Sequence, residues 1–122
     1  MDQRVFEELV AAAVDALPAM FVEKLENVEI VIEPWADRET LRRMGIQNPA
    51  QLLGFYHGVP RTQRTRSYTL VLPDKISLYR WPIEMRCRTL EEIQALIERV
   101  LRHEIAHHFG IDDERLQELD AY

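Results

Sequence analysis

The sequence contains little of what a disulfide-stabilised, disordered or membrane-spanning protein needs. Cys87 is the only cysteine among 122 residues, so no internal disulfide can form and a reducing compartment is permitted. Four Gly and six Pro are too few for a low-complexity chain. The longest apolar run near the N-terminus, Leu9–Val14, is shorter than a signal-peptide core and far from the ~20 residues of a membrane helix. We therefore expect a cytoplasmic protein with no membrane association.

A basic surface is also lacking. Fifteen Lys and Arg stand against 21 Asp and Glu, which gives a formal net charge of −6 and an isoelectric point near 5.2. Such a field repels phosphate backbones. The nearest basic cluster, Arg61, Arg64 and Arg66, is typical of a solvated loop. We expect no nucleic-acid partner.

The helix and strand signals predict one α+β domain over residues 1–122. Apolar residues at helical spacing predict a helix over 3–17, and Pro18 suits the first turn of a second helix that continues to about Leu25. Later segments complete the expectation: a strand at 28–32 buried on both faces, a helical turn at 37–44, strands at 68–72 and 76–81, a long helix, and a closing helix at 112–119. The sequence does not indicate the oligomeric state.

The long helix is the best-specified element. Thr89 and Glu92 have the spacing of a capping box, in which the Thr hydroxyl accepts from the Glu N–H and the Glu side chain reaches back. No Gly or Pro interrupts the chain from there to His108, and Gly110 suits the left-handed residue after a helix end.

Near the end of this helix lies the motif His103-Glu104-Ile105-Ala106-His107. Residues four apart share one helix face, so both imidazoles can reach a single metal ion. Glu104 follows the first histidine, where a carboxylate can hold and deprotonate a metal-bound water. The apolar stripe of the helix passes close to Glu104, where an unpartnered carboxylate would be costly to desolvate. A cleft or a nearby cation would remove that cost, and a metal site provides both.

A third ligand is expected just beyond the helix. A chain reversal at Gly110 lets Asp113 return an oxygen toward the metal, although Asp113 also suits the N-cap of the closing helix, and Asp112 can exchange roles with it. Two imidazoles and one carboxylate leave a fourth zinc position for water, as in catalytic rather than structural sites.

With two further segments, Leu53–Pro60 (LGFYHGVP) and Pro73–Arg80 (PDKISLYR), the motif makes the chain resemble the minimal zincin-like metallopeptidases, a family of small one-domain bacterial proteins. The resemblance extends from about Pro18 to Leu119. It implies a zincin-like α+β fold. We expect zinc-dependent hydrolysis of peptide bonds in a peptide or protein substrate.

The resemblance also assigns residues. It implies one Zn²⁺, or another divalent metal, held by His103, His107 and Asp113, with Glu104 as the general base. The extended motif is similar to that of the metzincins as well, but Asp113 stands where they have a third His.

Several alternatives remain open at this stage. His108 suits a hydrogen-bonded structural role, and His57, expected in a turn, can be a solvated loop residue or a visitor to the site. Zincins bind peptides along an edge strand, for which 68–72 and 76–81 are candidates. The protein can also be a non-enzymatic metal-binding or interaction module that retains the fold, or a hydrolase acting on other substrates.

Overall fold

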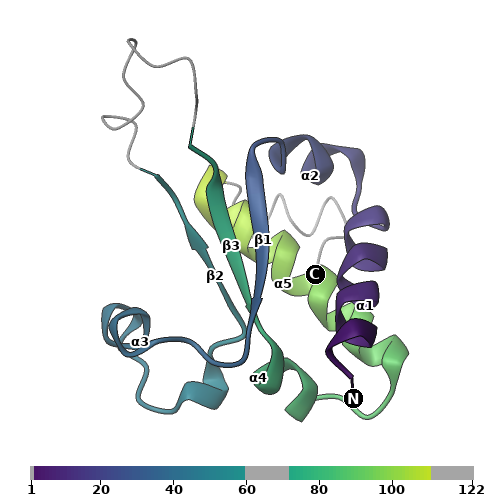
Figure 1. Cartoon of the computed structure of the whole chain (residues 1–122). Helices are drawn as coiled ribbons and strands as arrows, with labels where there is room; N and C mark the ends of the chain where they lie inside the picture. The colour runs from purple at the N-terminus through teal and green to yellow at the C-terminus, as the bar shows by residue number, and fades with distance from the viewer. Residues whose placement is uncertain (1, 60–71, 111–122) are drawn as a thin grey trace.

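The computed structural model describes residues 2–59 and 72–110, in which helices surround a sheet of three strands (Figure 1). The strands are β1 (Val28–Glu33), β2 (Gly54–His57) and β3 (Asp74–Tyr79), and their order in the sheet is β1-β3-β2. β1 pairs with β3 in parallel, whereas β2 pairs with β3 antiparallel, with Tyr56 opposite Ile76. The sheet is therefore mixed, and β2 forms one of its edges among the described residues.

The main core lies between one face of the sheet and three helices: α1 (Gln3–Asp15), α2 (Ala19–Lys24) and α5 (Leu90–Phe109). Figure 1 shows α5 running behind the sheet with α1 beside it. Each helix buries its apolar stripe, as amphipathic helices do. The largest fully buried side chains of this core are Phe6, Phe21, Ile76, Leu78, Ile83, Ile97, Leu101 and Ile105.

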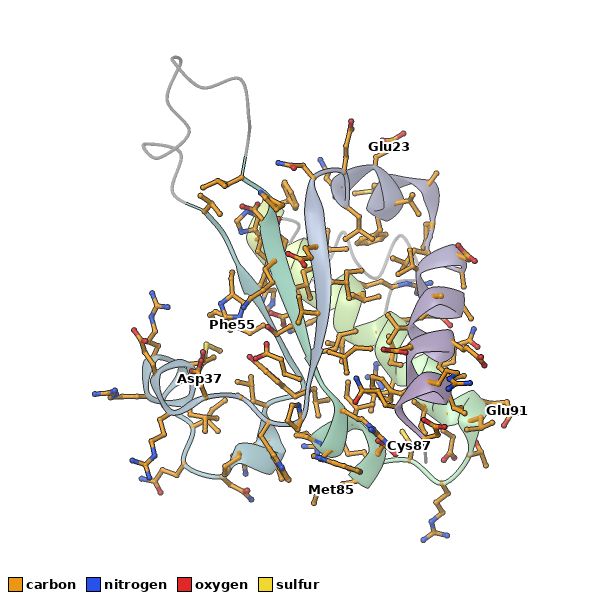
Figure 2. All side chains as sticks on the ribbon, viewed as in Figure 1. Glu23, Asp37, Phe55, Met85, Cys87 and Glu91 are labelled. Atoms are coloured by element: carbon orange, nitrogen blue, oxygen red, sulfur yellow. The ribbon has the colours of Figure 1, made fainter. Side chains whose placement is uncertain are left out.

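The opposite face of the sheet carries a smaller apolar cluster beneath α3 (Arg38–Met44) and the short 3₁₀ helix η1 (Pro49–Gln51). Asp37 caps α3, accepting a hydrogen bond from the Thr40 N–H at 2.7 Å. Phe55 of β2 packs into this cluster beside the buried Tyr79. Figure 2 shows Asp37 and Phe55 on this side of the sheet.

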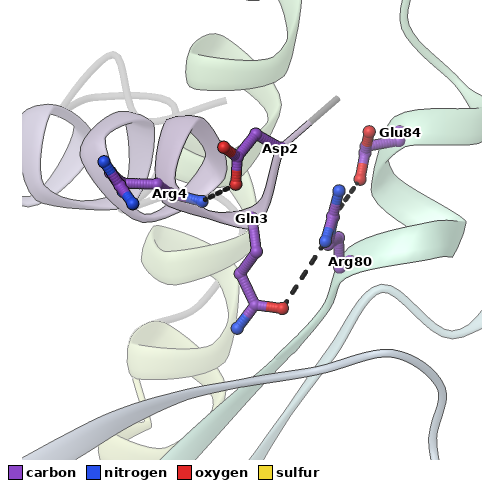
Figure 3. A network of polar contacts seen from close by, with 5 residues as sticks. All are labelled: Asp2, Gln3, Arg4, Arg80 and Glu84. Carbon is purple, nitrogen blue, oxygen red and sulfur yellow. Dashed lines mark hydrogen bonds and ion pairs between the residues drawn. The ribbon is translucent and has the colours of Figure 1, made fainter.

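The helix α4 (Arg80–Met85) follows directly after β3 and is tied to α1 by a buried arginine. The Arg80 side chain donates to Glu84 at 2.5 Å and to Gln3 of α1 at 3.5 Å (Figure 3). Its guanidinium also lies over the Trp81 ring, 4.5 Å from the centroid. Because a buried charge must be paired, Arg80 fixes the start of α1 against the end of β3.

The helical predictions are confirmed within the described ranges. The two N-terminal helices, the turn at 37–44 and the long helix form as expected, and the capping box of Thr89 and Glu92 is present in full. Gly110 ends α5 with a φ of 75°, a left-handed conformation that favours glycine. None of the helices in residues 2–59 and 72–110 combines the length and apolar composition that crossing a membrane requires.

The strand predictions need correction. The strand expected at 76–81 begins at Asp74 and ends at Tyr79, and it lies in the middle of the sheet rather than at an edge. β1 is partly exposed along its length instead of buried on both faces, because the second face of the sheet is only partly covered. The expected strand at 68–72, apart from Leu72, and the closing helix at 112–119 lie outside the described residues.

Candidate metal site and catalytic cleft

A cleft of about 800 Å³ opens between α5 and the edge strand β2. His103, Glu104 and His107 line it from the helix, and Gly54 and Tyr56 line it from the strand. The apolar stripe of α5 thus ends in an open cleft, which resolves how a carboxylate is tolerated near the centre of that stripe. The three residues that the motif predicted to act together are brought together.

The two motif histidines face the same space. The ring centroids of His103 and His107 are 4.0 Å apart, with the ring planes tilted by 52°. His103 is partly buried and His107 is exposed, so the pair stands at the rim of the cleft, accessible to an ion from solvent. One turn of α5 therefore presents two neighbouring imidazoles on one side of the helix, as the i, i+4 spacing predicts.

Glu104 is held against the edge strand. One of its carboxylate oxygens accepts a hydrogen bond from the Tyr56 backbone N–H at 3.1 Å. Burial raises the pKa of the Glu104 carboxyl to about 7, against a smaller lowering by this hydrogen bond. A buried carboxyl with a pKa near neutrality suits the uptake and release of a proton at physiological pH.

The strand that holds Glu104 is itself fixed by a frame around Asp74. The Tyr56 hydroxyl donates to the Asp74 carboxylate at 2.7 Å, and the Val59 N–H donates to its other oxygen at 2.8 Å. The His108 ring stacks on the Tyr56 ring with centroids 3.9 Å apart, and its Nε2 lies 3.8 Å from Asp74. Gly58 leaves room for this arrangement, since a Cβ there would sit 2.9 Å from His108 Cε1.

This frame contains residues near the motif whose contacts the sequence did not predict. Tyr56 and Asp74 lie in the segments Leu53–Pro60 and Pro73–Arg80, which carry the family resemblance, but no spacing in the sequence links either residue to the motif on α5. The 48-residue separation of Tyr56 and Glu104 leaves no local signal, because the contact depends on how β2 sits against α5. The structural role expected of His108 is supported by its packing on Tyr56, although its side chain is 37% exposed.

Comparison with known protein families agrees with this geometry. Residues 25–122 match the zincin-like metallopeptidase family. The chain belongs to this family. A comparison with curated proteins gives no match. The family assignment covers the sheet and the whole of α5, and the mixed α+β architecture is consistent with a zincin-like fold.

Zincin-like metallopeptidases hold a metal ion, typically zinc, and the donor set of this chain fits one in part. Two neighbouring imidazoles at a cleft rim are suitable zinc ligands. Within residues 2–59 and 72–110, no group of three His, Cys, Asp or Glu side chains gathers to hold a metal. Asp113 and Asp112, the two candidates for the third ligand, lie outside the described residues.

His57 lies away from the cleft of this zincin-like protein. It belongs to β2, but its side chain points to the face opposite Tyr56, as neighbours along a strand do. There its Nε2 lies 3.2 Å from the Ser77 hydroxyl, which donates to the Glu33 carboxylate at 2.5 Å. Desolvation in this cluster lowers the pKa of His57. His57 is thus neither a loop residue nor a neighbour of the motif histidines.

Proposed function

We propose that this chain is a zinc-dependent peptidase in which His103, His107 and Asp113 hold the metal and Glu104 is the general base. The observation that carries the proposal is the position of Glu104, a partly buried carboxylate in a cleft beside two accessible imidazoles. The family assignment supports the same chemistry. A zinc ion bound there supplies a Lewis acid that polarises a carbonyl and lowers the pKa of a water.

The chain's own residues would supply the remaining steps. Glu104 takes the proton of the attacking water and passes it to the leaving amine, a transfer typically worth about 10²–10⁴-fold in rate. The Tyr56 N–H keeps the carboxylate at the strand side of the cleft. Burial favours proton uptake by Glu104 at neutral pH.

The edge strand β2 offers a surface for the substrate. Leu53 accepts a backbone hydrogen bond from Tyr79 of β3, so the backbone groups of alternate residues, Gly54 and Tyr56, face the other way, toward the cleft. The Tyr56 N–H is held by Glu104, so a substrate strand would pair with the Gly54 backbone and the Tyr56 carbonyl instead. An extended peptide can add to such an edge through its own main chain. We therefore propose β2, rather than either of the strands expected from the sequence, as the strand that binds a peptide or protein substrate.

The first test is metal content. Purified chain without a His tag should bind about one zinc, and His103→Ala or His107→Ala should abolish this at micromolar zinc because the remaining donors are too few. His57→Ala is the matched control and should keep the metal, since its side chain lies on the opposite face of β2. A wild type that stays metal-free near pH 7 would refute the metal site.

The third ligand has its own comparison. Asp113→Asn should weaken zinc binding in a chelator-competition titration, because a neutral amide is a poorer ligand than a carboxylate. Asp112→Asn should change it little, since Asn and Asp cap helices equally well. The reverse ranking would move the ligand to Asp112.

The decisive test of catalysis is Glu104→Gln. The variant should keep the metal and lose at least about a hundredfold of any peptide hydrolysis, as expected for removal of a general base. Cleavage that survives the change would remove Glu104 from that role. A zinc-loaded wild type that cleaves no member of a peptide library would favour the non-enzymatic metal-binding module instead.

A cytoplasmic location completes the proposal. Cys87 is partly buried against the main core and is a free thiol, so the fold does not depend on an oxidising compartment. Fractionation of the producing cells with an antibody to the chain tests this, and recovery outside the cytoplasm would refute it.

A further inference from the structure

The charges lining the cleft differ in sign from the chain as a whole. The protein carries a formal net charge of −6. Among the described residues lining the cleft, Glu104 is the only carboxylate, whereas two arginines, Arg86 and Arg99, also line it. Low-dielectric walls around a cleft concentrate such a local field. The part of the cleft beyond Glu104 is therefore suited to an anionic group.

Arg99 is the better placed of the two. It lies on α5 four residues before His103, so the two side chains share one face of the helix about 6 Å apart along its axis. Its side chain is exposed, and no hydrogen bond or ion pair joins it to another residue in the described part of the chain. Its guanidinium is thus available to a ligand.

Arg86 extends the cationic region. Its Nη1 donates to the Ala50 carbonyl oxygen at 2.9 Å and lies 3.5 Å from that of Pro82. These contacts fix the side chain near η1 and the end of α4, and within residues 2–59 and 72–110 the other donors of its guanidinium bond to no further residue. Arg99 precedes His107 and His108 by about two turns of α5, and Arg86 contacts Ala50 of η1. The two arginines therefore lie toward the η1 end of the cleft and the two histidines toward the other end.

The direction of β2 determines which side of a bound peptide lies near Arg86 and Arg99. Gly54 of β2 lies against Val100 of α5, and Tyr56 lies against Glu104. β2 and α5 therefore run in the same direction, from the η1 end of the cleft toward the C-terminal part of α5 that carries the motif histidines. A peptide that adds to β2 in the more stable antiparallel sense would run the opposite way and place its C-terminal side toward Arg99. Because an extended residue spans about 3.3 Å, Arg99 lies within reach of the first two residues after the bond at the motif.

We propose that the cleft selects peptides with a carboxylate within two residues on the C-terminal side of the scissile bond, and that Arg99 is the specificity-determining residue. The carboxylate is either an acidic side chain or the free C-terminus of a short peptide, and both present the same planar acceptor to a guanidinium. The inference rests on the proposed peptidase function, because that function sets where the peptide lies along β2. Recognition of the carboxylate is a binding event, however, and can be measured without cleavage.

The test uses zinc-loaded Glu104→Gln protein and three fluorescent peptides of one sequence, measured by anisotropy at low salt. The first peptide has Gln within two residues after the scissile bond and ends in an amide. The second has Glu at that position and the same amide. The third has Gln at that position and a free C-terminal carboxylate. We expect at least one carboxylate peptide to bind about three- to tenfold more tightly than the neutral one, and this preference should shrink at 0.5 M salt because the pair is partly exposed. Which peptide gains identifies the source of the carboxylate.

Variants then assign the preference to its residue. Adding Arg99→Gln should remove it, and Arg99→Lys should restore part of it, since Lys keeps the charge but not the bidentate geometry. Arg88→Gln is the control, because Arg88 is also exposed but does not line the cleft. All variants are checked for one bound zinc first, which separates recognition from loss of the site.

The outcomes distinguish this inference from the proposed function. Equal binding of all three peptides, no binding of any, or a preference unchanged by Arg99→Gln would overturn the role of Arg99, whether or not the wild type is a peptidase. An Arg99-dependent preference in a protein whose wild type cleaves nothing would support carboxylate recognition and refute the peptidase function alone.

Discussion

The hydrogen bond between Tyr56 and Asp74 gives the sharpest prediction about how the cleft is held together. The Tyr56 side chain is 9% exposed, and its hydroxyl donates to a carboxylate oxygen at 2.7 Å. That carboxylate also fixes the Val59 N–H and lies near His108. Tyr56→Phe removes one oxygen and leaves the ring, its stacking on His108 and its backbone N–H in place.

The magnitude follows from the charge of the acceptor. A hydrogen bond to a charged group contributes about 1.5–3 kcal/mol net. No cavity forms, because Phe fills the same volume. The Asp74 side chain is 13% exposed, so water can solvate the released oxygen only in part. We therefore expect Tyr56→Phe to lower the free energy of unfolding by about 1.5–2.5 kcal/mol.

Urea unfolding at pH 7 measures this loss. A chelator is present throughout, because a metal that binds only the folded state would stabilise both proteins and obscure the difference. Asp74→Asn and the double variant complete a mutant cycle, which should give a coupling energy of at least about 1 kcal/mol for a direct pair. A Tyr56→Phe loss below about 0.5 kcal/mol, or additive single losses, would refute the frame described for the edge strand.

Three further perturbations test the layers around the site. Gly54→Ala should destabilise by about 1–3 kcal/mol in the same urea assay, since a Cβ there would lie 2.6 Å from Val100 Cγ1; a neutral effect would mean that α5 and β2 are not so close. Ile97→Ala should cost about 2–5 kcal/mol in thermal unfolding, because Ile97 is fully buried. His57, whose folded pKa is lowered, takes up a proton first in the unfolded chain, so stability should fall as pH drops below its unfolded value of about 6.5. His57→Gln should flatten that pH dependence, and an unchanged slope would exclude this histidine as its source.

Local signals explain why α5 could be predicted almost to the residue. Its start is set by a capping box contained within four residues, and its end by Gly110 in a left-handed conformation. Each signal acts through hydrogen bonds that the helix must satisfy wherever it packs. The positions of His103, Glu104 and His107 on the helix could be predicted for the same reason, because they depend only on spacing within α5.

The sheet could not be predicted in the same way. β2 has only four residues. It is an edge strand because, among the described residues, only β3 pairs with it. The end of β3 at Tyr79 had a readable signal that the strand prediction missed. Pro82 falls within the first turn of α4, where a missing N–H breaks no helical hydrogen bond and the fixed φ favours a helix.

The position of Glu104 favours a catalytic protein over a non-enzymatic metal-binding module. Binding an ion at this cleft needs the two imidazoles and a third donor, but not a carboxylate on the apolar side of the same helix turn. Among the described residues, Glu104 has one hydrogen-bond donor, the Tyr56 N–H, and its burial still raises its pKa to about 7. An apolar residue at that position would fill the stripe of α5 without the desolvation cost of a charge. Departures from the packing rules of this kind are expected where function requires them, and the partly buried position of Glu104 beside two imidazoles supports the general-base role proposed for it.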